Sequence, residues 1–384
     1  MHLEGFRNIQ IATKLAFHPQ FNIFSGDNGS GKTSLLESIY FLALGRSFRT
    51  NKSNNLINFK HDFAVVHATY TDRISNQKIK ISSLKYYNQH KINKIGGAIA
   101  TGVEVANLTP TQLINDETSK LIFKEPDLRR KFLDWLAFYA NKNYQNLWKE
   151  FHITLQQRNK VLKQIKAKRS SKFSDIYKIL NNIDIIFVEL SAKITLIRQH
   201  IWKQFQQVWL KIIQDLHIIE PLITELKLFT GWNGDLSEQL LNCRDLDVQH
   251  GFTLYGPHKA DLQFKLNGKL AKEILSRGQG KLAAFALILA RTKFIKDINL
   301  SSEFVSVLLI DDLSAELDED NINKIMRALS YYKNDLQVFI TANKQQGLLN
   351  VLSTKGSAAK WFEINKGIIV EHDSHLKSCV FQHG

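Results

Sequence analysis

A glycine-rich segment near the N-terminus constrains the fold of this chain more than any other feature. Residues 26–33 read Gly-Asp-Asn-Gly-Ser-Gly-Lys-Thr, which matches the pattern GxxxxGK[ST] in full. The segment Phe21–Phe24 before it, apolar except for Asn22, predicts a strand, and the apolar spacing from Ser34 to Leu44 predicts a helix after it. A strand, a glycine-rich turn and a helix in this order are typical of a loop that binds phosphate groups.

The residue types in this segment suit a polyphosphate. Glycines let backbone N–H groups approach the phosphates without a Cβ in the way, and the start of the following helix attracts negative charge. We expect Lys32 to reach the β- and γ-phosphates as a catalytic residue, and the Thr33 hydroxyl to bind Mg²⁺. An ordinary glycine-rich turn is the alternative. The predicted nucleotide-binding residues here are Gly26, Asp27, Asn28, Gly29, Ser30, Gly31, Lys32, Thr33 and Ser34.

A second predicted strand ends in two carboxylates. The run Val307–Ile310 is wholly apolar, and Asp311 and Asp312 follow it directly. Ligands of α/β sheets collect at the carboxyl ends of the strands. We therefore expect Asp311 to hold Mg²⁺ through water and Asp312 to polarise the attacking water as a catalytic residue. A buried strand that ends in aspartate is common by itself, and the phosphate loop is what favours this interpretation.

A third motif, Leu-Ser-Arg-Gly-Gln-Gly-Lys at residues 275–281, opens a helix predicted to begin near Lys281. Serine and glycine at a helix N-terminus form a second anion site, although a simple N-capped helix would carry the same residues. Residues 314–318, Ser-Ala-Glu-Leu-Asp, follow the acidic strand. The order and spacing of these motifs favour a shared function in nucleotide binding over a set of unrelated turns and helix caps.

The β and helical patterns divide the chain into three parts. Residues 1–115 and 250–384 alternate short strands with helices, whereas residues 116–249 are mostly of helical period. Between residues 125 and 216 the only proline is Pro126 and there is no glycine, which favours long helices. We predict an α/β fold in which the two outer parts build one mixed sheet with flanking helices, and the middle part is an inserted helical arm.

Two further strands are predicted within the first part, at Phe63–Tyr70 and Lys78–Leu84. We expect them to form an antiparallel edge of the same sheet.

The charge of the chain favours a polyanionic partner. Its 51 Lys and Arg residues against 36 Asp and Glu residues give a formal net charge of +15, which suits nucleic acid or an anionic membrane surface. A basic cluster lies on the predicted arm, either as a solvated helix face or as a contact for phosphates. Its members are Arg158, Lys160, Lys163, Lys166, Lys168, Arg169 and Lys172.

The composition also bears on the compartment. The two cysteines, Cys243 and Cys379, form no CxxC pair, which fits a reducing compartment and argues against a zinc site. The longest apolar run, Leu282–Ala290, is too short to span a bilayer, and no signal peptide is recognisable. We expect a cytoplasmic protein with no membrane partner.

Taken together, the motifs resemble those of the ATP-binding-cassette (ABC) ATPase heads, in the group that includes the SMC chromosome-maintenance proteins. Residues 275–279 look like the signature motif of this group and residues 314–318 like its D-loop. In that group the signature motif of one head completes the ATP site of another head. The resemblance implies ATP and Mg²⁺ as cofactors, an ATP-dependent homodimer, and ATP contacts in trans from Ser276, Gly278, Gln279 and Asp318.

Further segments, in order, resemble the RecF family of bacterial DNA replication and repair proteins. They are Gly5–Asn8, Gly45–Arg49, Leu108–Leu113, Arg129–Trp135 and Tyr255–Leu262. The resemblance implies an ATPase with weak, DNA-stimulated turnover in recombinational repair and replication-fork maintenance. It would close on gapped, single- or double-stranded DNA with little sequence specificity and help to load RecA together with RecO and RecR.

The resemblance also assigns individual residues. Gln112 matches the Q-loop residue, with a catalytic role and a contact to Mg²⁺, and Thr341 stands where transporter-type cassettes carry a switch histidine. The DNA-binding candidates are Arg46, Arg49, Lys163, Lys166, Lys168 and Arg169. Three alternatives stay open: a P-loop kinase or other NTPase acting on small molecules, a non-catalytic DNA-bound scaffold, and a transporter subunit.

Overall fold

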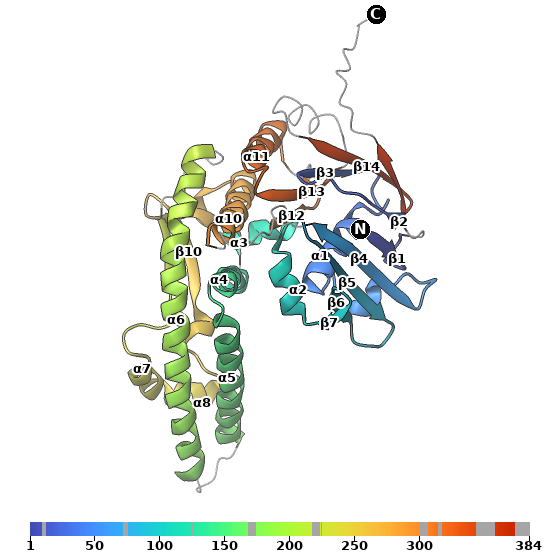
Figure 1. Ribbon diagram of the computed structural model, residues 1–384. Helices are drawn as coiled ribbons and strands as arrows, with labels where there is room; N and C mark the ends of the chain where they lie inside the picture. The colour runs from blue at the N-terminus through green and yellow to red at the C-terminus, as the bar shows by residue number, and fades with distance from the viewer. Residues whose placement is uncertain are drawn as a thin grey trace, which may run out of the picture. The chain divides into compact units, whose positions relative to one another are not determined.

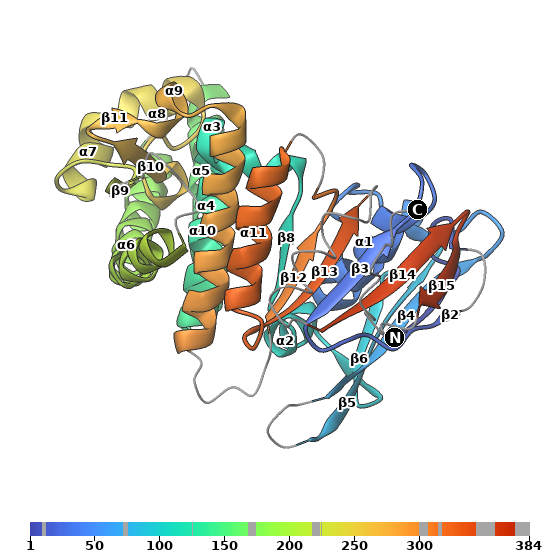
Figure 2. The same ribbon diagram turned by 90° about the horizontal axis from the view of Figure 1, so that it is seen from above.

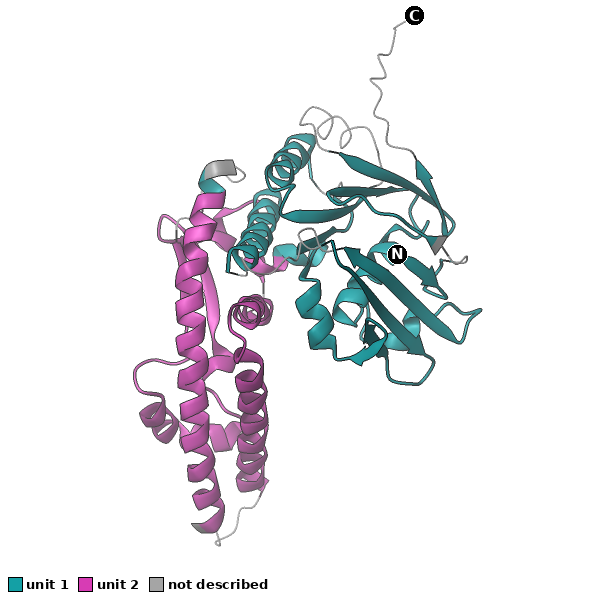
Figure 3. Ribbon diagram, viewed as in Figure 1, with its two compact units in different colours: residues 1–119, 213–220, 277–384 teal, residues 120–212, 221–276 magenta. Residues whose placement is uncertain are grey.

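The protein is described here by a computed structural model that covers residues 1–9, 13–71, 76–124, 126–167, 174–216, 223, 225–298, 306–313, 317–342 and 358–372. The chain forms two compact units (Figure 3). The first, called the sheet unit, comprises Met1–Ser119, Ile213–Glu220 and Arg277–Gly384. The second, called the arm unit, comprises Lys120–Ile212 and Pro221–Ser276. The predicted mixed sheet with an inserted helical arm is confirmed.

The main sheet of the sheet unit combines strands from both ends of the chain. Its order is β15 (Ile368–His372), β14 (Ala359–Asn365), β3 (Phe21–Ser25), β13 (Leu336–Ala342), β12 (Ser306–Ile310) and β8 (Thr111–Ile114). All neighbours are parallel except β15, which is antiparallel to β14. Every residue of β3 and β12 is buried, as expected for central parallel strands covered on both faces.

A second sheet of the same unit is antiparallel throughout. Its order is β2 (Thr13–Lys14), β1 (His2–Glu4), β4 (Phe63–Thr71), β5 (Lys78–Tyr86), β6 (Ile92–Ile95) and β7 (Ala98–Ala100). The expectation that β4 and β5 form an edge of the main sheet is therefore wrong. Strand β4 pairs with β1 on one side and β5 on the other, so neither of its edges is available to the main sheet. Burial alternates along β4 and β5, as is common for an antiparallel sheet covered on one face.

Helix α1 (Lys32–Leu44) packs against strands of both sheets and shares one hydrophobic core with them. Helices α1 and α10 (Arg277–Ile298) cover opposite faces of the main sheet, and both contact β8. Adjacent residues of a strand point to opposite faces, so β8 can contact the two helices at once. Helix α11 (Glu319–Tyr331) packs beside α10 (Figure 2). Smaller elements are η1 (Ser53–Leu56), α2 (Gly102–Leu108) and η2 (Asp116–Ser119).

The arm unit is built on three helices, α4 (Pro126–Ala140), α5 (Tyr144–Ala167) and α6 (Ser174–Leu216), as the absence of glycine predicted (Figure 1). Its other elements are α3 (Lys120–Phe123), β9 (Glu225–Phe229), α7 (Leu236–Asn242), α8 (Arg244–His250), η3 (Pro257–Lys259), β10 (Asp261–Leu266), β11 (Lys269–Leu270) and α9 (Ala271–Ile274). This unit continues to Ser276, beyond the expected limit at residue 249, because β10 pairs with β9 along its length.

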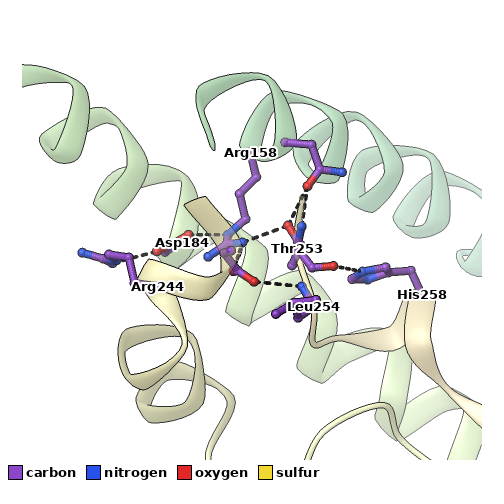
Figure 4. Close-up of polar contacts among 8 residues, drawn as sticks. Arg158, Asp184, Arg244, Thr253, Leu254 and His258 are labelled. Carbon is purple, nitrogen blue, oxygen red and sulfur yellow. Dashed lines mark hydrogen bonds and ion pairs between the residues drawn. The ribbon is translucent and has the colours of Figure 1, made fainter. Parts of the chain in front are cut away.

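A buried arginine ties the arm unit together (Figure 4). Arg158 of α5 is fully buried, and it donates to Asp184 of α6 at 2.7 Å, to Asp247 of α8 at 2.6 Å and to Thr253 at 2.9 Å. This residue was counted in the basic cluster of the arm. Its charge is neutralised by structural ion pairs with Asp184 and Asp247, so it is no candidate for contacting phosphates.

No helix in the described part of the chain is both long and apolar enough to cross a membrane.

Candidate nucleotide-binding site

The phosphate loop lies between β3 and α1, at the carboxyl edge of the main sheet. Two of its glycines are required by their surroundings. Gly26 has φ 145°, and a Cβ there would lie 2.1 Å from the carbonyl oxygen of Ile364. Gly31 has φ 121°, and its Cβ would lie 3.2 Å from Asn8 Nδ2. The loop therefore holds a backbone conformation that L side chains rarely adopt, and at its glycines no Cβ blocks the approach of a phosphate to the backbone.

Lys32 begins α1 and is largely buried. Its Nζ donates to the carbonyl oxygens of Gly26 at 2.5 Å and Asp27 at 2.9 Å. Burial lowers the pKa of Lys32, while the nearby carboxylates of Asp312, Asp27 and Asp311 raise it. The ammonium thus lies folded over the loop, where a phosphate could take the place of the two carbonyls.

Ser30 supplies an independent indication of a ligand. Its Oγ is buried and has no hydrogen-bond partner among the described residues. A buried hydroxyl without a partner is unfavourable, and a phosphate oxygen would satisfy it. The glycine cradle, the folded lysine and this hydroxyl together fit a polyphosphate.

The two aspartates after β12 lie at the same edge of the main sheet as the loop, with β13 between β12 and β3. Thr33 Oγ1 donates to Asp311 Oδ1 at 3.0 Å, and Thr341 Oγ1 donates to the same oxygen at 2.8 Å. Burial, chiefly, and the charge of Asp312 raise the pKa of Asp311, while the two hydroxyl hydrogen bonds lower it. A hydroxyl and a carboxylate at this separation are oxygen ligands of the kind that Mg²⁺ binds, together with phosphate oxygens.

Asp312 occupies an unusual backbone conformation. Its φ is 51°, in the left-handed region that residues other than glycine adopt uncommonly, although aspartate tolerates it. Its N–H donates to Thr341 Oγ1 at 2.7 Å. Thr341, at the end of β13, thereby fixes both aspartates.

These residues surround a cavity of about 380 Å³. Its wall is formed by Arg7, Asn8, Asn28, Gly29, Gly31, Lys32, Thr33, Ser34, Arg49, Asp312 and Thr341. The structure thus brings the phosphate loop and the acidic strand to one site. Arg7 and Asn8 had no role assigned from the sequence, although both belong to the segment Gly5–Asn8 that resembles the RecF family.

Gln112 is not part of this wall. It lies within β8 opposite Leu308, it is almost fully buried, and its Oε1 accepts a hydrogen bond from Arg291 of α10. Strand β8 continues for two residues beyond Gln112, so the edge of the sheet is reached at Asn115 instead. Asn115 lines a smaller hollow beside Asp311 and was missed because the sequence does not mark where β8 ends.

The residues expected to act in trans lie elsewhere. Ser276 is exposed directly before α10, and Gly278 and Gln279 fall in the first turn of α10, which begins at Arg277, earlier than predicted. Asp318 accepts from the N–H of Asn321 at 2.7 Å and so caps α11. These four described residues do not line the cavity of their own chain. Residues 314–316 lie outside the described part of the chain.

The predicted DNA contacts are dispersed. Arg49 lines the cavity, and its Nη1 lies 3.8 Å from Oε2 of the buried Glu37. Arg46 is exposed, and its charge adds to burial in lowering the pKa of Lys91. Lys163 and Lys166 are exposed on α5, as is Lys160. Lys168, Arg169 and Lys172 lie outside the described residues.

Comparisons with known proteins find similarity over almost the whole chain. A family model for the RecF/RecN/SMC N-terminal domain matches residues 1–360. The DNA replication and repair protein RecF of Shewanella baltica (strain OS155 / ATCC BAA-1091) is 32% identical over 369 residues, which cover 96% of this chain and 97% of that protein.

Solved structures give the same result for the fold. The recombination mediator protein RecF with ATP, from the RecFOR pathway, aligns with a TM-score of 0.78 and 26% identity over 97% of this chain and 96% of that one. An Smc head bound to the C-terminal winged-helix domain of ScpA aligns with a TM-score of 0.58 and 16% identity, over 97% of both chains. The fold is that of an ABC-type P-loop ATPase head with an inserted helical arm. The chain belongs to the RecF family of DNA replication and repair proteins, within the larger family of RecF, RecN and SMC N-terminal domains.

Proposed function

We propose that this chain is an ATP-dependent DNA-binding protein of DNA replication and recombinational repair, in which slow ATP hydrolysis acts as a switch. The observation that carries the proposal is the meeting of Lys32, Thr33 and Asp311 around a glycine cradle with an unsatisfied buried hydroxyl. The name of the Shewanella relative and the ATP-bound state of the RecF structure support the same role.

Each residue of the nucleotide site would have a separate role in binding or hydrolysing ATP. Lys32 would leave the loop carbonyls and compensate the β- and γ-phosphate charge. Thr33 and Asp311 would hold Mg²⁺, which when bound neutralises charge on the phosphates. Asp312 would accept a hydrogen bond from the attacking water, with Thr341 fixing its backbone. Asn115, directly after β8 and beside Asp311, would take the role expected of Gln112.

A homodimer would complete the site. Ser276, Gly278 and Gln279 lie at the exposed start of α10, away from the cavity of their own chain. A serine and backbone N–H groups at a helix start favour an anion. In the proposed dimer they contact the γ-phosphate bound by the partner, and Asp318 lies at the same interface. ATP would then hold two heads together until it is hydrolysed.

DNA is the proposed polyanion. The net charge of +15 supplies a sequence-independent attraction, and Lys163 and Lys166 are exposed on the arm. Arg46 is close enough to Lys91 to depress its pKa, so two cations lie together there. Phosphate contacts of this kind give little sequence specificity. We further propose that the protein works in the cytoplasm at single-strand gaps and helps RecO and RecR to load RecA.

Equilibrium titration with ATP, in Mg²⁺, tests the proposal for the site. The parent chain should bind ATP and dimerise in sedimentation velocity, whereas Lys32→Met should lose ATP binding because the phosphate charge is no longer compensated. Arg244→Met serves as a matched control, since that cation pairs with Asp184 in the arm. ATP binding that survives Lys32→Met at the parent affinity would contradict the proposed site.

A further inference from the structure

Glu37 is a fully buried carboxylate on α1, behind the wall of the nucleotide cavity. A buried carboxylate must be paired to be tolerated. Arg7 donates to it with both edges of its fork, from Nε to Oε2 and from Nη2 to Oε1, each at 2.8 Å. Ser47 Oγ donates to Oε1, and Arg49 Nη1 lies 3.8 Å from Oε2. One carboxylate therefore joins α1 to two other segments of the chain.

The two arginines are held very differently. The Arg7 side chain is 18% exposed, and its backbone, at φ 53°, is fixed by hydrogen bonds to Leu56 and Asn58. The Arg49 side chain is 48% exposed, and among the described residues its ion pair is the long contact to Glu37. Both line the cavity. Arg7 is thus a fixed partner of Glu37, whereas Arg49 can leave without orphaning the carboxylate.

Ser47 links Glu37 to the backbone that carries Arg49. While its hydroxyl donates to Glu37, the same oxygen accepts the N–H of Arg49 at 2.9 Å and the N–H of Thr50 at 3.0 Å. The orientation of this hydroxyl is set by the carboxylate. The turn formed by residues 47–50 is consequently anchored to the helix that begins at the phosphate loop.

We propose that Glu37 and Ser47 are positioning residues of the nucleotide site, which hold this turn so that the Arg49 guanidinium exchanges Glu37 for a phosphate oxygen of ATP. A guanidinium suits this exchange because its planar fork matches carboxylate and phosphate oxygens alike. The inference rests on the proposed function, since it requires ATP in the cavity. Ser47 acts through Arg49 and touches no substrate itself.

A double-mutant cycle on the full-length protein tests this. The affinity for ATP labelled with a fluorescent methylanthraniloyl group is measured for the parent, Ser47→Ala, Arg49→Ala and the double variant. Loss of one charge-assisted contact should weaken binding by about tenfold in Arg49→Ala. Ser47→Ala should weaken it by about threefold, and the double variant should match Arg49→Ala, because the serine has no effect once Arg49 is absent. Ser47→Thr keeps the hydroxyl and should restore affinity, and the exposed Ser53→Ala serves as the control.

The possible outcomes distinguish a failure of this inference from a failure of the proposed function. Parent affinity in Ser47→Ala, or effects that add in the double variant, would overturn the inference while leaving ATP binding intact. A lower melting temperature with unchanged affinity would likewise reduce Ser47 to a structural role and overturn it. If the parent binds no ATP, the proposed function falls, and this inference falls with it.

Discussion

Thr341 offers the sharpest single perturbation of the site. Its buried hydroxyl donates to Asp311 at 2.8 Å and accepts the N–H of Asp312 at 2.7 Å. Thr341→Val keeps the shape and removes both hydrogen bonds. A hydrogen bond to a carboxylate contributes about 1.5–3 kcal/mol, and an unsatisfied buried N–H costs about 1–3 kcal/mol. Because the surrounding groups relax in part, we expect Thr341→Val to remove about 2–4 kcal/mol of the free energy that holds the two aspartates in place.

Turnover should respond more than ATP binding does. If about half of this energy is lost from the transition state, the rate falls about 5–30-fold, since each 1.4 kcal/mol is a factor of ten. The Thr341 hydrogen bond lowers the pKa of Asp311, so its removal should raise that pKa and move the acid limb of the rate to higher pH. Steady-state phosphate release across pH, with Thr341→Ser as the control, measures both effects. Parent turnover and an unmoved acid limb in Thr341→Val would refute this account of the site.

The remaining predictions concern catalysis, the arm and pH. Asp312→Asn should abolish turnover yet keep ATP binding and dimerisation, and hydrolysis at the parent rate would exclude Asp312 as the catalytic residue. Asp247→Asn should lower the free energy of unfolding of the arm, measured in urea, by about 3 kcal/mol, because the buried Arg158 loses a carboxylate partner. The exposed Asp245→Asn is the control and should change this free energy by less than about 0.5 kcal/mol. Burial, chiefly, lowers the pKa of His258 to about 4, below its unfolded value of about 6.5. The unfolded chain therefore binds the proton first, and up to about 3 kcal/mol of stability present above pH 6.5 should be lost between pH 6.5 and 4. In His258→Gln this dependence should be weaker by that amount, and an unchanged pH profile would contradict it.

Local signals in the sequence predicted the frame of the site well. The glycine pattern at residues 26–33 and the apolar run before Asp311 specify a loop and a strand end by short-range chemistry alone. The parallel pairing of β3 with β13 and of β13 with β12 then brings the two to the same edge. For such elements, the local pattern and the tertiary position are tied together by the topology of a parallel sheet.

Features that depend on strand register or on long-range pairing could not be predicted from the sequence. Gln112 and Asn115 are three residues apart, and only the length of β8 decides which one lies at the edge of the sheet. Arg158 belongs to a run of exposed lysines by sequence, yet its partners Asp184 and Asp247 are distant in the chain. Burial alternates along strand β4, and a strand covered on one face fits an edge of the main sheet as well as a separate sheet. Periodicity does not distinguish these cases.

The central claim, that ATP closes the protein on DNA, is tested most directly by fluorescence anisotropy. A labelled gapped duplex is titrated with the protein at near-physiological salt, with Mg²⁺-ATP and without nucleotide, and with Lys32→Met as the control. The account predicts much tighter binding with ATP for the parent, no effect of ATP for the variant, and affinity that falls steeply with salt. Equal binding of the parent in both conditions would contradict ATP-gated closure on DNA.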